Sequence, residues 1–336
     1  MRVSHRLLVA VAAASTAAVV VAGCDRAKGT SSTGPASSRS ATSAMAGSGG
    51  GAAEFVDADP SKLLFRALVL YRDPVKVSEI VAAHPELVSK PISGMPPLAL
   101  ACDSESLPVV QALVERKADM NARDVENHTV LWTAVRRGTL PIVKYLIEHG
   151  SNVKELQDDQ QTVLWAAETR EMAEFLIDAG IDPKHKDVNG DTALHVACRH
   201  SLKEVVDLLL DRGLDIESVG HWDMRPLETA AATETGDPRP VVLLLLARGA
   251  NINAKGFNGH TALHECAFYN RQTMADLLLS RGADPNVKDN DGRTPADLAI
   301  FAGKNERWRM INQFYKRGGL GPDGKPGVLL LPPKDQ

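Results

Sequence analysis

The chain has 336 residues, and its 38 basic and 42 acidic side chains leave a formal net charge of −4. This near balance argues against a nucleic-acid-binding protein, because such proteins carry a strongly basic surface. Aromatic residues make up only 4% of the chain, so aromatic side chains at solvent-facing positions would be informative.

The first segment in chain order, residues 1–23, has the pattern of a secretory signal peptide. Basic residues precede an apolar run from residue 7 to residue 22, which is short for a membrane span of about 20 residues. The run ends in Val21-Ala22-Gly23-Cys24, which resembles the lipobox of bacterial lipoproteins. The resemblance implies lipidation of Cys24 and a membrane protein of the bacterial cell envelope that faces the periplasm. The choice between inner and outer membrane stays open, and an ordinary signal peptide with a chance cysteine is the alternative.

Residues 24–57 continue from this cysteine as a segment rich in Ser, Gly, Ala and Thr. Large apolar side chains are almost absent, so the segment cannot offset the entropy of ordering, and we predict a flexible linker. The folded domain is predicted to span residues 58–315, and a tail rich in Gly and Pro to occupy residues 316–336.

A repeat with a period of 33 residues (129 minus 96, and 294 minus 261) fills the predicted domain. The residues that open the first helix of each repeat are Pro96, Thr129, Thr162, Thr192, Arg225, Thr261 and Thr294. A Thr in this place can cap the helix, and a Gly ends the second helix in a left-handed conformation. Lys117 replaces that Gly in the first repeat, which predicts a strained turn. One such unit cannot bury its own apolar face, so the copies must stack.

Three places depart from the regular pattern. The third repeat is three residues short (192 minus 162 is 30), and we place the loss after Ala167. The fifth repeat has three extra residues (261 minus 225 is 36), which form a loop at residues 233–240. Residues 63–88 have the pattern of a helix pair without a preceding hairpin, which predicts an N-terminal cap.

The clearest copy reads Gly259-His260-Thr261-Ala262-Leu263-His264, followed by Leu277-Leu278-Leu279 and Gly282-Ala283-Asp284-Pro285-Asn286. This pattern resembles the ankyrin repeat and recurs in register over about residues 61–315. The resemblance implies an all-α solenoid of helix pairs with β-hairpin fingers, with about seven repeats plus the N-terminal cap. It also implies a monomeric protein that binds other proteins, and structural roles for His195 and His264.

Motifs for catalysis or metal binding are missing from the sequence. There is no Cys-x-x-Cys, no zinc-binding pair of histidines, no phosphate loop and no Gly-x-Ser-x-Gly. Cys102, Cys198 and Cys266 lie on the packed sides of helices in different repeats, so we expect buried free thiols rather than disulfides. We therefore predict a non-enzymatic protein without cofactor or metal. An enzyme of unknown class is the weaker alternative.

In the ankyrin family, partners contact the finger tips and the exposed ends of the first helices. In repeats two to four these positions hold His128, Arg136, Arg137, Arg170, Arg199 and His200. In repeats five and six they hold His221, Trp222, Met224, Phe257, His260, Phe268 and Tyr269. The candidate partner-binding residues are Arg136, Arg137, Arg199, His200, Trp222, Phe257, His260, Phe268 and Tyr269. Trp222 and Phe257 could instead fold onto neighbouring fingers. Trp132 and Trp165, at the family's His position, could pack in the core or stack as a pair.

The predicted function is protein–protein interaction at the cell envelope with a periplasmic protein partner. One alternative is a general scaffold or protector of that partner. The other is an immunity protein that binds and neutralises a secreted effector delivered into the periplasm. Some ankyrin-type lipoproteins encoded beside phospholipase effectors resemble this second role. The sequence does not name the partner.

Overall fold

The computed structural model describes residues 59–301 and residues 314, 316, 318 and 319. The chain divides into two compact units, residues 1–53 and residues 54–336, and every described residue belongs to the second unit. The predicted signal peptide, Cys24, the linker and most of the predicted tail lie outside the described residues. None of the described helices is long and apolar enough to cross a membrane.

The described part begins with the predicted N-terminal cap. It consists of α2 (Pro60–Phe65), the π-helical segment η1 (Arg66–Leu70), α3 (Pro74–Ala83) and η2 (Pro85–Val88). Asp59 and Asp73 start the two helices, because their carboxylates accept hydrogen bonds from backbone N–H groups of the first turn. The cap packs on the first full repeat through α3 against α5 and η1 against α4.

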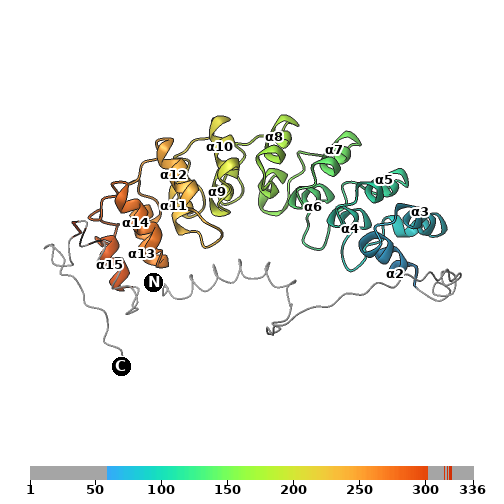
Figure 1. Cartoon of the computed structure of the whole chain (residues 1–336), viewed down its shortest axis with the longest axis horizontal. Coiled ribbons are helices and arrows are strands. Elements are labelled where there is room, and N and C mark those ends of the chain that lie inside the picture. The colour runs from blue at the N-terminus through green and yellow to red at the C-terminus, as the bar shows by residue number, and fades with distance from the viewer. Residues whose placement is uncertain (1–58, 302–313, 315, 317, 320–336) are drawn as a thin grey trace, which may run out of the picture. The chain divides into compact units, whose positions relative to one another are not determined.

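Stacked helix pairs follow the cap. Their bounds are α4 (Pro97–Asp103) and α5 (Leu107–Glu115), α6 (Val130–Arg136) and α7 (Leu140–Glu148), η4 (Val163–Ala166) and α8 (Arg170–Asp178), α9 (Ala193–Arg199) and α10 (Lys203–Asp211), α11 (Pro226–Ala232) and α12 (Arg239–Ala247), and α13 (Ala262–Tyr269) and α14 (Gln272–Ser280). Helix α15 (Pro295–Phe301) opens the next repeat. The first members pack on one another as an inner layer, and the second members form an outer layer (Figure 1). The predicted all-α repeat architecture is confirmed.

Each predicted opening residue precedes the first helical residue of its repeat. The Thr129 hydroxyl accepts a hydrogen bond from Trp132 N at 3.2 Å, as expected for a helix cap. The predicted turn at Lys117 is also confirmed, since its φ of 64° lies in the left-handed region that favours Gly.

The three-residue loss in the third repeat falls entirely on its first helix. Only the single 3₁₀ turn η4 remains, and Ala167 ends it in an extended conformation with ψ of 112°. The outer helix α8 keeps nine residues, like α10 and α12. The loop predicted in the fifth repeat lies against the end of α9, where the Thr233 and Thr235 hydroxyls both donate to the carbonyl oxygen of Arg199.

The predicted hairpin fingers are present as turns. The described residues contain no β-strand and only the isolated bridges Ile92–Met95 and Arg123–Thr129. A backbone hydrogen bond closes each turn, such as Gly220 N to Met224 O at 3.0 Å and Gly256 N to His260 O at 2.8 Å. The fingers are therefore too short for a ladder but keep the course of a hairpin.

The core between the layers consists mainly of Leu, Ile, Val and Ala side chains, together with three cysteines. Cys102, Cys198 and Cys266 are free and buried, as predicted, and burial raises the pKa of each thiol far above its usual range. Protonated thiols of this kind act as small apolar side chains.

Candidate protein-binding face

Trp222 stands at the tip of the finger that leads into α11. Its φ of 59° places an aromatic residue in the left-handed region, which costs about 1–2 kcal/mol for a residue other than Gly. The next finger has Asn258 at the same point, with φ of 53°, and Asn tolerates this conformation better. The finger thus holds the backbone of Trp222 in a strained conformation at the surface, and backbone strain clusters at functional sites.

The ring of Trp222 contacts the ring of Phe257, which stands on the next finger. The centroids are 5.3 Å apart and the rings meet edge to face at 65°, a favourable geometry for aromatic pairs. The two residues still expose 38% and 40% of their surfaces. Both sequence-based expectations therefore hold in part, because the rings pack on each other and also face solvent.

A buried carboxylate fixes the finger that carries Trp222. Asp191 Oδ1 accepts a hydrogen bond from His221 N at 2.8 Å, and Asp191 Oδ2 lies 2.5 Å from the Arg199 guanidinium. Burial opposes ionisation of Asp191, but Arg199 and the His221 N–H outweigh it and hold the pKa of Asp191 below its usual value. Arg199, a candidate partner-binding residue, is therefore also a positioning residue for Trp222.

His195 and His264 have the structural role that the family resemblance implied. In each, Nδ1 accepts a hydrogen bond from the N–H of the capping Thr, so Nε2 carries the proton. Nε2 then donates at 3.1 Å to a carbonyl of the next finger, Ser218 O for His195 and Arg293 O for His264. Burial lowers the pKa of both rings, and that of His264 to about 4, so both stay neutral and tie each repeat to the next.

The expectation that His260 faces solvent was wrong, since only 9% of the residue is exposed. Its Nδ1 lies 2.9 Å from Glu265 Oε1, and its Nε2 lies 3.5 Å from Asp289 Oδ2 on the following finger. The ring fills the space between its own helix and that finger, so His260 supports the fold.

The remaining candidates lie at the other end of the inner helices. Phe268 and Tyr269 meet edge to face at 5.0 Å, at the end of α13 opposite the finger of Phe257. At 1.5 Å per residue, α13 separates the two aromatic pairs by about 12 Å. Arg136, Arg137 and His200 are exposed at the ends of α6 and α9. The candidate set therefore divides into a fingertip pair and a group at the helix ends.

Arg170 was wrongly placed on this face by the sequence analysis. It opens the outer helix α8, where its guanidinium lies 3.5 Å from Asp207 and 3.3 Å from Asp211 of α10.

Trp132 stacks on His128, with the ring centroids 5.3 Å apart, and the described residues show no ring contact between Trp132 and Trp165. Both tryptophans pack against the core, which favours core packing over a stacked pair.

Some functional candidates were missed by sequence reasoning. Val125 and Val188 expose 80% and 63% of their surfaces at finger positions equivalent to that of Phe257. A count back from each helix-opening residue would have found them, because each stands four residues before it. Glu228 was also missed, although it stands three residues after Arg225, at the family's His position.

Glu228 is a buried acid in α11, with 2% of its surface exposed. Its Oε2 accepts a hydrogen bond from Arg225 N at 2.8 Å, and its Oε1 is buried without a hydrogen-bond partner in the described structure. Burial is the main cause that raises its pKa to about 8. Glu228 therefore caps its helix, as His195 and His264 do, but offers no donor to the next finger unless it is protonated.

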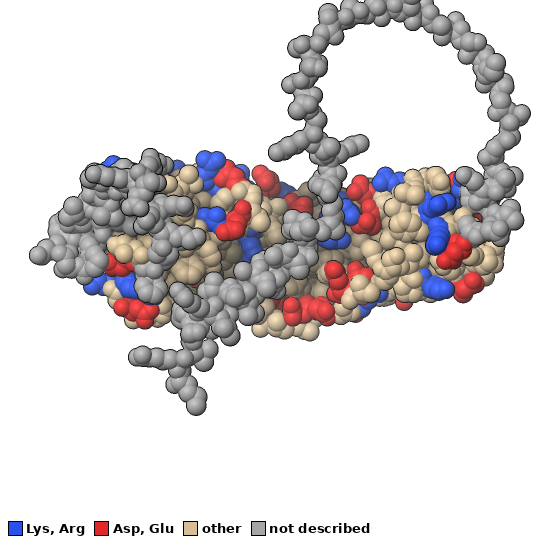
Figure 2. All heavy atoms as spheres, turned by 90° about the horizontal axis from the view of Figure 1, so that it is seen from below, with Lys and Arg blue, Asp and Glu red and all other residues tan. Residues whose placement is uncertain are grey.

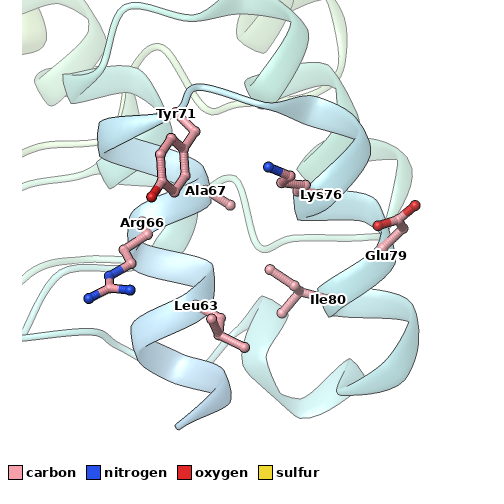
Figure 3. Close-up of a pocket in the computed structure, with 7 residues that line it drawn as sticks. All are labelled: Leu63, Arg66, Ala67, Tyr71, Lys76, Glu79 and Ile80. Carbon is pink, nitrogen blue, oxygen red and sulfur yellow. The ribbon is translucent and has the colours of Figure 1, made fainter. Parts of the chain in front are cut away.

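An open hollow of about 180 Å³ lies on the N-terminal cap. Its lining consists of Leu63, Arg66, Ala67, Tyr71, Lys76, Glu79 and Ile80. Leu63 and Ile80 face each other across it, whereas Arg66 and Glu79 point away (Figure 3). The Lys76 ammonium lies 5.1 Å from the centre of the Tyr71 ring, which occupies both side chains in a cation–π contact. The hollow is thus an open surface feature with a mostly apolar lining.

Acidic and basic side chains both appear on the side of the stack seen from below (Figure 2). Among the residues that the structure describes, no three His, Cys, Asp or Glu side chains converge so as to hold a metal ion.

Comparison with known proteins agrees with the fold. The model of the family described as Ankyrin repeats (3 copies) matches residues 70–157, 150–219 and 227–311. Serine/threonine-protein kinase 12 of Arabidopsis thaliana is 40% identical over 75 residues, which are 22% of this chain and 16% of that protein. The B-cell lymphoma 3 protein homolog of Mus musculus is 40% identical over 88 residues, 26% of this chain and 19% of that protein. The crystal structure of the human ASB11 ankyrin repeat domain is similar with a TM-score of 0.57 and 26% identity, over 66% of this chain and 98% of that one. The chain matches less than a fifth of the length of the Arabidopsis kinase and of the mouse B-cell lymphoma 3 homolog.

Proposed function

The chain belongs to the ankyrin-repeat family, and from that premise we propose that it is a non-enzymatic binding protein, anchored by lipid at Cys24 in the bacterial cell envelope. Ankyrin repeats are generally non-catalytic modules that bind proteins. The observation that carries the proposal is the half-exposed Trp222–Phe257 pair on a strained finger. Aromatic residues of this kind dominate the binding energy of protein interfaces.

The partner is proposed to be a periplasmic protein, and two roles use the same surface. A scaffold or protector leaves the activity of its partner unchanged. An immunity protein covers the active site of a secreted effector and abolishes its activity. By analogy with the ankyrin-type lipoproteins encoded beside phospholipase effectors, that effector would be a phospholipase. The aromatic pair fits either role, so the activity of the captured partner in the presence of this chain distinguishes them.

Exchange of both fingertip rings tests the binding proposal. The double variant Trp222→Asn with Phe257→Asn keeps the turns, because Asn258 and Asn290 already occupy the same points of the following fingers. A buried aromatic anchor carries about 2 kcal/mol, so we expect the affinity for the partner captured from envelope extract to fall at least about 30-fold. Affinity is measured by calorimetry and the fold by thermal unfolding.

Val75→Asn is the matched control, because Val75 is an exposed apolar residue on the N-terminal cap. It should leave the affinity unchanged. Normal affinity of the double variant, together with a normal melting temperature, would show that the partner binds elsewhere. The Phe268–Tyr269 pair is the next surface to test.

The lipid anchor is tested by Cys24→Ala. We expect the variant to lose incorporation of labelled palmitate and to leave the membrane fraction, because the cysteine thiol is the site of attachment. Labelling that persists in the variant would remove the lipoprotein proposal without touching the binding proposal.

A further inference from the structure

The tips of the fingers form a series of equivalent triplets, which we call the fingertip row. Each triplet ends two residues before a helix-opening residue. The row consists of residues 125–127, 158–160, 188–190, 221–223, 257–259 and 290–292. It repeats once per helix pair, so neighbouring tips stand about 8–10 Å apart, as stacked helices do.

Apolar side chains are unusually exposed along the fingertip row. Val125, Val188, Trp222 and Phe257 all belong to it, and all are among the exposed large hydrophobic residues of the described structure. Isolated exposed apolar residues are normal on a surface, but here Val188, Trp222 and Phe257 stand on three successive tips. The row therefore offers apolar contact at several points along its length.

The charges of the fingertip row have one sign. Its acidic residues are Glu126, Asp158, Asp159, Asp223 and Asp291, and all are exposed. No Lys or Arg belongs to the triplets. Lysines lower on the fingers bind the backbone instead, since Lys186 Nζ donates to Val219 O at 3.1 Å and Lys255 Nζ donates to Lys288 O at 2.7 Å. Next to the last triplet, the Arg293 guanidinium lies 2.6 Å from Asp291 Oδ2 and neutralises that carboxylate. Glu126, Asp158, Asp159 and Asp223 therefore carry the negative charge of the row, although the chain as a whole is nearly neutral.

Contacts between neighbouring tips hold the row in place. Asn127 Nδ2 donates to Asp158 Oδ1 at 2.6 Å, and Val188 N donates to Asp159 O at 3.0 Å. Farther along, the Trp222–Phe257 ring contact is followed by the hydrogen bond from Asn290 N to Asn258 O at 2.9 Å. A surface that is ordered before binding loses less entropy when it binds.

We propose that the fingertip row binds a basic polypeptide segment that carries aliphatic or aromatic side chains. This inference rests on the proposed function and adds the chemistry of the partner. Lys and Arg of the segment face the tip carboxylates, and its apolar side chains contact the exposed rings and valines. At about 3.3 Å per residue, an extended segment places every third residue opposite a new tip.

A peptide library displayed on phage is the probe, with the full-length chain in detergent as the target. We expect the enriched peptides to carry net positive charge and to contain aliphatic or aromatic residues. Their affinity should fall at least tenfold for Trp222→Asn with Phe257→Asn. Enrichment of acidic peptides, or of none, would overturn the proposal.

The charge requirement is tested with the triple variant Glu126→Gln, Asp159→Asn and Asp223→Asn. At low salt its affinity for the enriched peptides should fall at least about fivefold, and the loss should shrink as salt screens the charges. The control is Glu148→Gln, Glu171→Gln and Glu204→Gln, which removes the same charge from exposed positions on the outer helices. Equal effects of the two triple variants would overturn the proposal.

The same variants separate this inference from the proposed function. One outcome is a captured partner that loses affinity for the Trp222→Asn, Phe257→Asn variant and binds the triple charge variant with unchanged affinity. That result would support the proposed function and contradict the proposal that the partner segment is basic. A partner whose affinity is unchanged by the loss of both rings would contradict the fingertip site in the proposed function and in this inference.

Discussion

Leu209→Ala should lower the free energy of unfolding by about 2–5 kcal/mol, the usual cost of removing a buried Leu side chain. Leu209 is fully buried in the middle of α10, which packs between α8 and α12 of the neighbouring repeats. The cavity left behind borders the core on both sides, so neither neighbour can collapse into it without moving a whole repeat. Because a repeat is held mainly by its neighbours, the damage should weaken both interfaces of the fourth repeat.

Leu210→Ala is the matched control for Leu209. Leu210 belongs to the same helix but is only partly buried, so its truncation should cost much less. Urea unfolding followed by circular dichroism measures both variants. If the two midpoints agree, the assigned register of α10 is wrong. If the Leu209→Ala curve splits into two transitions, the array has been divided at this repeat.

The register of the repeats could be predicted because several independent signals coincide at each opening residue. Thr192 shows them together, with a helix cap, the following Ala-Leu-His and the Gly that ends the previous helix pair. Exposure of Trp222 and Phe257 followed from the same register, because a finger tip has no layer above it. Local pattern is enough for features of this kind.

The misplaced residues depended on information outside their own repeat. His260 packs against Asp289, which belongs to the next finger and therefore lies outside the repeat that was read. Arg170 stands eight residues after its opening residue, as Arg137 and His200 do, and the count placed it at the end of an inner helix. The three-residue loss had removed that helix end, so the same count reached the start of α8 instead. The acidic sign of the fingertip row also appears only when equivalent positions of all fingers are compared.

Substitution of Glu228 should also change stability strongly, because this carboxyl group occupies the position at which other repeats hold a neutral His that donates a hydrogen bond. His195 sits beside Gly220, and Glu228 sits beside the equivalent Gly256, so close that a Cβ on Gly256 would lie 2.2 Å from Glu228 Oε2. The groups that face the carboxyl are the Arg225 N–H and guanidinium, which favour its ionised form, and Glu265 and Glu217, which oppose it. Burial is the largest influence and raises the pKa from 4.5 to about 8.

The sign of the pH dependence follows from these two values. Between pH 4.5 and about pH 8 the folded chain holds a proton on Glu228 that the unfolded chain has released. The contribution of Glu228 to the free energy of unfolding is therefore highest below pH 4.5 and falls as the pH rises, by up to about 1.4 kcal/mol per pH unit. Above about pH 8 both states are ionised and the contribution becomes constant.

Glu228→Gln should therefore stabilise the domain more as the pH rises, because the amide keeps the hydrogen bond to Arg225 N and cannot ionise. We expect little difference from the parent chain at pH 5 and a gain of several kcal/mol at pH 8, measured by urea unfolding at pH 5, 6.5 and 8. Glu228→His should behave in the same direction, since Gly256 leaves the room that Gly220 leaves beside His195, and Nε2 could then donate to the next finger as it does there. Glu204→Gln, on the exposed face of α10, is the control and should follow the parent chain at every pH. Parallel curves for Glu228→Gln and the parent chain would mean that Glu228 is already ionised in the folded state, with water or a shifted finger reaching its Oε1.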